Sequence, residues 1–117
     1  MPKLRIAKEF TFDAAHYLPD YHGKCERMHG HTYKLRVIVE GPVKKDGLVM
    51  DFMEIKKIVN ERVVDKLDHS TINDTIKVAS AENMCVWVWK QLKPKIRGLA
   101  EVRIWETANS FAIYTGK

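Results

Sequence analysis

The sequence has little cysteine and no long apolar run. Only two cysteines, Cys25 and Cys85, occur among its 117 residues, which excludes a multi-disulfide scaffold. No stretch is long and apolar enough to cross a membrane, and the N-terminal residues do not resemble a signal peptide. The sequence therefore predicts a cytoplasmic protein with reduced thiols and no membrane partner.

Repeats of high identity, linkers and low-complexity segments are also lacking. At 117 residues, 45% of them hydrophobic, the chain is long enough for one core and too short for two ordinary domains, so we expect a single domain over residues 1–117. The formal net charge is +5, but basic residues are interleaved with acids, and no aromatic and basic stripe indicates a nucleic-acid groove. We therefore expect a mixed-charge surface and no nucleic-acid partner. If the excess charge has a function, a phosphorylated small molecule would suit it as well as a nucleic acid would.

Alternation of apolar and polar residues predicts four strands. Two lie early in the chain, at residues 3–13 and 31–41, and a turn follows the second of them. Two more lie at the end, at residues 99–107 and 110–115, and a tight two-residue connection joins them.

Two amphipathic helices are predicted between the second and third strands. The first starts after Asp51, with Glu54 completing a capping box, and its apolar stripe runs to Leu67. The second starts at Ser80 and ends at Pro94. The order of elements is ββααββ, which indicates an α+β domain: a four-stranded antiparallel sheet with both helices on one face.

Three of the five histidines continue the apolar parity of predicted strands. His16 extends the first strand forwards, whereas His29 and His31 extend the second strand backwards. If these strands pair as an antiparallel hairpin, the three imidazoles converge. Three neutral imidazoles suit Zn²⁺ and leave a fourth position open, as catalytic zinc sites do. The alternative is a set of ordinary histidines on a loop rim, and His22, which has no parity support, is assigned to the surface.

The two cysteines lie in different settings. Cys25 is four residues before His29, in a short loop beside the predicted metal. Cationic surroundings lower a thiol pKa, so Cys25 is a candidate thiolate. Cys85, on the apolar stripe of the second helix, is predicted to be a buried small hydrophobe.

The spacing Cys25-x-x-x-His29-Gly-His31, with His16 thirteen residues before His29, resembles the 6-pyruvoyltetrahydropterin and 6-carboxytetrahydropterin synthase family. The resemblance spans nearly the whole chain and implies a tunnelling fold (T-fold), subunits assembled as trimers stacked into hexamers, and active sites at subunit borders. It also implies the substrate 7,8-dihydroneopterin triphosphate. Four further segments follow in the family's order: Val49-Met50-Asp51-Phe52, Leu67-Asp68-His69, Ser80-Ala81-Glu82-Asn83 and Trp105-Glu106-Thr107.

The resemblance also implies roles for individual residues. By themselves, an Asp and a His after a helix are compatible with a helix-end cap or a surface pair, so the role of this pair depends on the resemblance. The acid-base chemistry that the resemblance implies requires no redox cofactor. The resemblance implies zinc bound by His16, His29 and His31, Cys25 as the base that removes a proton from the substrate side chain, and Asp68 with His69 as a second acid-base pair.

Glu106 has support from its own position. It shares the parity of Val102 and Ile104, and a carboxylate on an otherwise apolar face needs a partner. A pterin ring offers adjacent N–H donors that a carboxylate can accept in a two-pronged hydrogen bond. The resemblance implies the same anchoring role, assisted by the hydroxyl of Ser80. The alternative is that residue 106 lies where the strand leaves the core.

The loop around Cys25 bears on the product. Its three-residue spacing to His29 resembles the bacterial and archaeal 6-carboxytetrahydropterin synthases, whose product feeds 7-deazaguanine nucleosides such as queuosine and archaeosine. Glu26 resembles instead the subgroup that makes 6-hydroxymethyl-7,8-dihydropterin, although a solvated loop acid is equally compatible with it. Formation of 6-pyruvoyltetrahydropterin is a further alternative. An alternative of another class is a non-catalytic zinc module that binds pterins or purines, which would not need Cys25.

Overall fold

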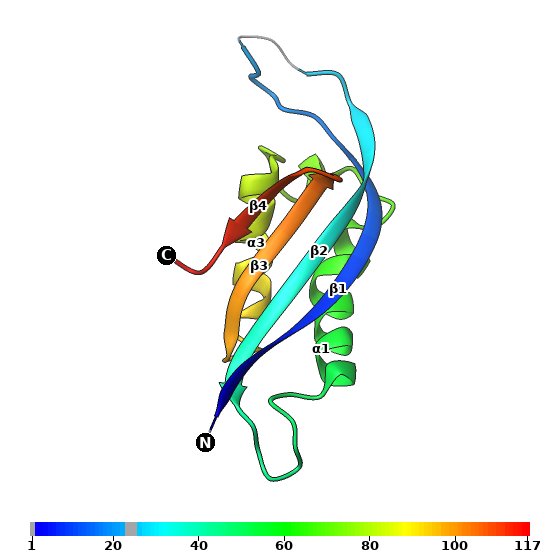
Figure 1. Ribbon diagram of the computed structural model, residues 1–117. Coiled ribbons are helices and arrows are strands. Elements are labelled where there is room, and N and C mark those ends of the chain that lie inside the picture. Colours follow the sequence, from blue (N-terminus) through cyan, green and yellow to red (C-terminus); the bar gives the residue numbers. More distant parts are fainter. Residues whose placement is uncertain (1, 23–25) are drawn as a thin grey trace.

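The computed structural model describes residues 2–22 and 26–117, and Figure 1 shows them as one antiparallel sheet with the helices against one of its faces. The strands lie in the order β1-β2-β3-β4. The α+β architecture predicted from the sequence is confirmed. The strands are β1 (Lys3–His16), β2 (His29–Pro42), β3 (Leu99–Thr107) and β4 (Ser110–Tyr114).

The pair β1 and β2 positions the site. The two strands pair antiparallel over their full length, from Lys3 opposite Pro42 to His16 opposite His29. Both are longer than the alternation predicted, because the pairing continues past the last regular apolar position and includes the histidines. The long hairpin therefore carries its histidines at one end of the sheet.

The first helical segment is more complex than its sequence pattern indicated. Helix α1 (Phe52–Val59) is followed without a break by a π-helix, η1 (Asn60–Val64), and a short α2 (Asp65–Leu67). Asp51 caps α1, since its Oδ1 accepts a hydrogen bond from Met53 N at 2.8 Å. The predicted capping box is only half formed, because no hydrogen bond from Asp51 N to the Glu54 carboxylate is found in the described part of the chain.

The second long helix follows its predicted bounds closely. A short 3₁₀ helix, η2 (Ile72–Asp74), precedes α3 (Ala81–Leu92). Ser80 caps α3 by accepting a hydrogen bond from Asn83 N at 3.1 Å. The apolar stripe of α3 is buried, and it includes Cys85, as the sequence predicted. No helix in residues 2–22 and 26–117 is long and apolar enough to span a membrane.

The core lies between the sheet and the helices. Every second residue of β2 from Tyr33 to Val39 is buried, and so are Ile55 and Val59 of α1. Phe52, the first residue of the predicted apolar stripe of α1, is the exception, because it is largely exposed. No helix of the described residues covers the other face of the sheet. On this face, Glu9 of β1 accepts a hydrogen bond from Arg36 of β2 and forms ion pairs with Lys34 and Arg36.

Candidate active site

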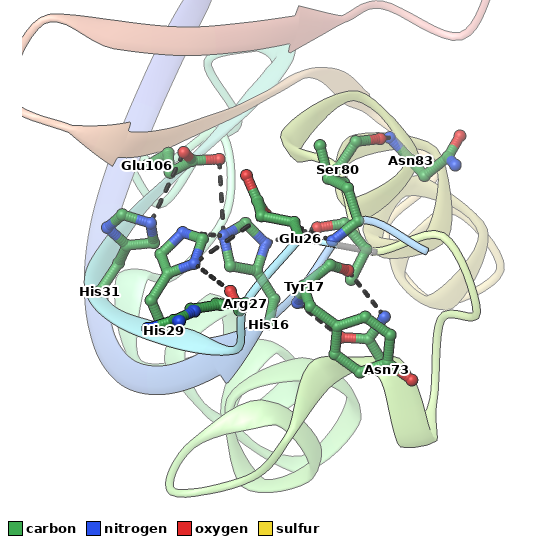
Figure 2. A network of polar contacts seen from close by, with 12 residues as sticks. His16, Tyr17, Glu26, Arg27, His29, His31, Asn73, Ser80, Asn83 and Glu106 are labelled. Atoms are coloured by element: carbon green, nitrogen blue, oxygen red, sulfur yellow. Dashed lines mark hydrogen bonds and ion pairs between the residues drawn. The ribbon is translucent and has the colours of Figure 1, made fainter. Parts of the chain in front are cut away.

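The paired ends of β1 and β2 bring three histidines together (Figure 2). The ring centroids lie 4.7 Å apart for His16 and His29, 5.1 Å for His16 and His31, and 4.8 Å for His29 and His31. His16 is 2% exposed. Strand parity therefore predicted the right neighbours, because register and period place all three rings on one face.

Backbone carbonyls fix the tautomers of two of these rings. His16 Nδ1 lies 2.7 Å from the carbonyl oxygen of Ala79, and His29 Nδ1 lies 2.9 Å from that of Arg27. A carbonyl oxygen can only accept, so each Nδ1 carries the proton, and Nε2 of the neutral ring keeps a free lone pair. The two Nε2 atoms lie 3.2 Å apart. Two lone pairs that face each other this closely repel unless a cation or a proton lies between them.

His31 completes the group. Its Nε2 is buried and makes no hydrogen bond with any described residue, and Glu106 Oε1 lies 3.5 Å away. Burial lowers the pKa of His31, and the negative charge of Glu106 opposes this shift only in part. His31 is thus held in the neutral form that binds metals.

The donor set fits a zinc ion. One atom from each of the three imidazoles and one carboxylate oxygen of Glu106 all lie within 4.8 Å of one another. Neutral imidazole nitrogens are ordinary zinc ligands, and backbone carbonyls that bind Nδ1–H are the usual outer partners of such ligands. A bound cation would give the buried Nε2 of His31 a partner, and it would accept the lone pairs of the two facing Nε2 atoms of His16 and His29.

Glu106 faces this centre from a β-bulge in β3. The register of β3 and β4 shifts between Trp105 and Thr107, so Glu106 is the extra residue of the bulge. Figure 2 shows its carboxylate reaching toward His31 and His16. It also lines a hollow of about 450 Å³ with Glu82 and Phe111. The parity argument for an inward Glu106 agrees with this placement, and Glu82 is a lining acid that the helix pattern alone did not single out.

Glu26 also lies at the centre rather than in solvent. Its side chain is 27% exposed, and its Oε1 lies 3.9 Å from His29 Nδ1. Oε1 also accepts a hydrogen bond from Leu18 N at 3.3 Å, while Glu26 N donates to Leu18 O at 2.9 Å. Three contacts therefore hold Glu26 near the histidines. Cys25, the predicted base, lies outside the described residues.

Asp68 and His69 form a second, separate group. Asp68 Oδ2 lies 3.0 Å from His69 Nδ1, and Asp68 Oδ1 accepts a hydrogen bond from Asp13 N at 3.0 Å. That backbone hydrogen bond is the main reason why the pKa of Asp68 is lowered. His69 is 80% exposed, has a left-handed backbone with φ of 57°, and donates its N–H to Asp13 O. The structure groups these residues with Asp13, not with the three histidines.

Two further side chains near the centre were not predicted as site residues. Tyr33 is fully buried, with its ring 5.8 Å from His16 and 5.5 Å from His31, and its hydroxyl has no hydrogen-bond partner among the described residues. Burial, reinforced by nearby carboxylates, raises the pKa of Tyr33 well above its usual range, so it stays protonated. Asn73 contacts the backbone that follows His16. Its position in the sequence, between two helices, gave no sign of this contact.

Comparisons with known proteins agree with this geometry. Residues 5–117 match the family model described as 6-pyruvoyl tetrahydropterin synthase. A relative from Archaeoglobus fulgidus, named a putative 6-carboxy-5,6,7,8-tetrahydropterin synthase, is 41% identical over 87% of this chain and 87% of its own. A dihydroneopterin monophosphate aldolase from Pyrococcus furiosus is 38% identical over 95% of this chain and 96% of its own. The structure of 6-pyruvoyl tetrahydropterin synthase from Caenorhabditis elegans matches with a TM-score of 0.89 and 28% identity, over 100% of this chain and 98% of that one.

Proposed function

Because the chain belongs to the 6-pyruvoyl tetrahydropterin synthase family, we propose that it is a zinc-dependent lyase that converts 7,8-dihydroneopterin triphosphate to 6-carboxy-5,6,7,8-tetrahydropterin. The observation that carries this proposal is the group of three histidines, two of which have Nδ1 bound to carbonyls and Nε2 atoms 3.2 Å apart. The Archaeoglobus fulgidus relative, whose name includes this product, supports the choice of reaction.

His16, His29 and His31 would hold the ion through their Nε2 atoms. A zinc ion bound there supplies Lewis-acid stabilisation of negative charge on the hydroxyl oxygens of the substrate side chain. Glu106 accepts the N–H donors of the pterin ring, which the hollow beside its carboxylate could admit. The hydroxyl of Ser80 is proposed to assist this binding.

Cys25 is proposed to remove a proton from the substrate side chain, and His69, oriented by Asp68, to transfer a second one. Asp68 and His69 group with Asp13 and not with the histidine centre of their own chain. We therefore propose that they serve a neighbouring subunit in a trimer or hexamer, with active sites at the subunit borders. The high exposure of His69 supports this arrangement, because its ring is free to enter another subunit's site.

Carbon-carbon cleavage with uptake of one water molecule and release of acetaldehyde and triphosphate would give 6-carboxy-5,6,7,8-tetrahydropterin, because the new carboxylate needs one oxygen more than the two side-chain hydroxyls supply. This product would supply 7-deazaguanine nucleosides in the cytoplasm. Elimination of triphosphate without cleavage would give 6-pyruvoyltetrahydropterin instead.

A second candidate is formation of 6-hydroxymethyl-7,8-dihydropterin. The observation that favours it is the half-buried carboxylate of Glu26, 3.9 Å from His29 Nδ1, which places a possible second base at the centre. The Pyrococcus furiosus relative, named dihydroneopterin monophosphate aldolase, agrees with this alternative. The variants C25A and E26A separate the two candidates, since two distinct bases predict the loss of different products.

The test is to incubate zinc-loaded protein with 7,8-dihydroneopterin triphosphate, and separately with the monophosphate, and to identify the products by mass spectrometry. Formation of 6-carboxy-5,6,7,8-tetrahydropterin with acetaldehyde, abolished by C25A and retained by E26A, supports the main proposal. Hydroxymethyldihydropterin that disappears in E26A supports the second. Bound zinc without turnover of either substrate would favour a non-catalytic pterin-binding module and would refute both.

A further inference from the structure

The segment between α2 and α3 holds the last residues of β1 in place. Ala15 N donates to Ser70 O at 3.0 Å, and Ala15 forms a parallel bridge with Thr71. One residue further along the chain, His16 Nδ1 binds Ala79 O. Residues on both sides of η2 therefore hold the end of β1 from outside the sheet.

Asn73 makes the central contacts of this attachment. Its Oδ1 accepts a hydrogen bond from Tyr17 N at 3.0 Å, and its Nδ2 donates to Tyr17 O at 2.9 Å and to Lys77 O at 3.0 Å. The side chain thus binds both backbone groups of Tyr17, as a neighbouring β-strand would, and also braces the loop that leads to Ala79 (Figure 2). One amide therefore fixes the residue after His16 and the loop whose carbonyl orients the His16 ring.

The same stretch of backbone carries Glu26. Leu18, next to Tyr17, binds Glu26 through both its N–H and its carbonyl. Tyr17 and Leu18 thus connect Asn73 on one side with Glu26 on the other. A shift of this backbone would move the zinc ligand and the carboxylate together.

We infer that Asn73 is a positioning residue that holds both His16 and Glu26 in the candidate active site through the backbone of Tyr17 and Leu18. The inference rests on the proposed zinc centre and extends it to a residue that touches neither metal nor substrate. Loss of an outer contact of a zinc ligand typically reduces metal affinity by about 10- to 100-fold. Asn73 acts one step further out, through the backbone of Tyr17, so we expect Asn73→Ala to lose about 10-fold, the lower end of this range.

The matched control is Asn83→Ala. Asn83 Nδ2 also donates to a carbonyl of this loop, that of Val78, at 2.9 Å, but among the described residues Asn83 makes no hydrogen bond with the backbone after His16. Both variants lose an amide that braces the loop, and only Asn73→Ala releases Tyr17. A purely structural role of Asn73 would therefore lower stability in both variants and leave the properties of bound metal alike.

The experiment compares the full chain with N73A, N73D and N83A. Zinc affinity is measured by competition with a chromophoric chelator, the electronic spectrum is recorded with Co²⁺ in place of zinc, and urea unfolding is measured in the presence of EDTA. N73D keeps the acceptor for Tyr17 N–H and loses both donor hydrogen bonds, so it serves if N73A does not fold. We expect a zinc affinity about 10-fold lower and an altered Co²⁺ spectrum for N73A and N73D only.

Each outcome decides one point. If the unaltered chain binds one zinc ion and the Asn73 variants bind it equally well with unchanged Co²⁺ spectra, Asn73 does not position the centre and the inference fails while the proposed function stands. If Asn73→Ala and Asn83→Ala lose the same affinity, the effect is general destabilisation, and the inference also fails. If the unaltered chain binds no zinc, the proposed function fails first and the inference fails with it.

Discussion

Ser80 caps α3 and is proposed also to assist substrate binding, and replacing it by Ala, Thr and Asp should separate these two roles. Ser80 has extended backbone angles, φ −75° and ψ 158°, and its hydroxyl oxygen accepts a hydrogen bond from Asn83 N at 3.1 Å. It therefore satisfies one of the free N–H groups at the start of α3. The resemblance assigns the same hydroxyl to the substrate. A cap needs any short oxygen acceptor, whereas a substrate contact depends on the hydroxyl itself.

The expected loss can be worked from the cap alone. Replacing a Ser N-cap by Ala costs about 1 kcal/mol. For a chain of 117 residues, an unfolding entropy of about 2.1 cal/mol/K per residue converts this loss into a fall in Tm of about 4 °C. Thr and Asp also accept from the helix N–H groups, so S80T and S80D should recover most of the stability.

The assay is thermal and urea unfolding of the three variants in EDTA, followed by steady-state kinetics of the zinc-loaded forms. We expect S80A alone to be destabilised, and S80D to be stable but to have a raised KM, because it lacks the hydroxyl. If S80T and S80D are as unstable as S80A, the hydroxyl does not act as a cap and the reasoning is refuted. If S80D keeps the KM of the unaltered chain, Ser80 does not contact the substrate.

Three further predictions concern buried and hydrogen-bonded groups. Tyr33→Phe in EDTA should unfold at an equal or higher urea concentration, because the replacement removes a buried hydroxyl that has no partner among the described residues; a loss above about 1 kcal/mol would contradict this. Burial raises the pKa of the Cys85 thiol to about 11. In the C25A variant, this remaining thiol should therefore react with a disulfide reagent at pH 8 at least about 100-fold more slowly in the native state than in urea. Rapid labelling of the native state would count against its burial. Because the pKa of Asp68 is lowered in the folded state, its carboxylate stabilises the fold above the ordinary carboxyl pKa, and this stability is lost as the pH falls through the lowered pKa. Urea midpoints measured from pH 5 downwards should therefore fall less steeply for Asp68→Asn than for the unaltered chain. Equal slopes would show that the hydrogen bond from Asp13 N does not stabilise the fold.

The sequence predicted those parts of the fold that local periodicity determines. Alternation of apolar and polar residues predicted the strands, and apolar stripes predicted the two helical segments, which together give the order ββααββ. Short polar residues before the stripes predicted the helix caps at Asp51 and Ser80. All of these features are present. The convergence of His16 with His29 needed only one further step, the assumption that consecutive strands pair. Each of these inferences depends on residues close in sequence or on one simple pairing.

The parts that were not predicted depend on contacts between distant segments. Asn73 binds Tyr17, 56 residues away, and no periodicity near either residue encodes that approach. The π-helix η1 was not predicted either, although its widened turn fits the wide spacing of the buried stripe. The buried residues recur every four residues, against 3.6 for a regular α-helix: Ile55, Val59, Val63 and Leu67. Packing of the segment between α2 and α3 against the end of β1 determines which polar groups meet, and this becomes visible only in three dimensions.

Strand β1 carries residues of both groups of proposed catalytic residues. His16 and Asp13 are three residues apart in β1, so their side chains lie on opposite faces of the strand. His16 is buried beside His29 and His31, whereas the backbone of Asp13 binds the backbone of His69 and the side chain of Asp68. His69 also lines an open hollow together with His31. If Asp68 and His69 serve a second copy of the chain, as proposed above, the reaction depends on assembly, and dilution of the protein should lower its specific activity.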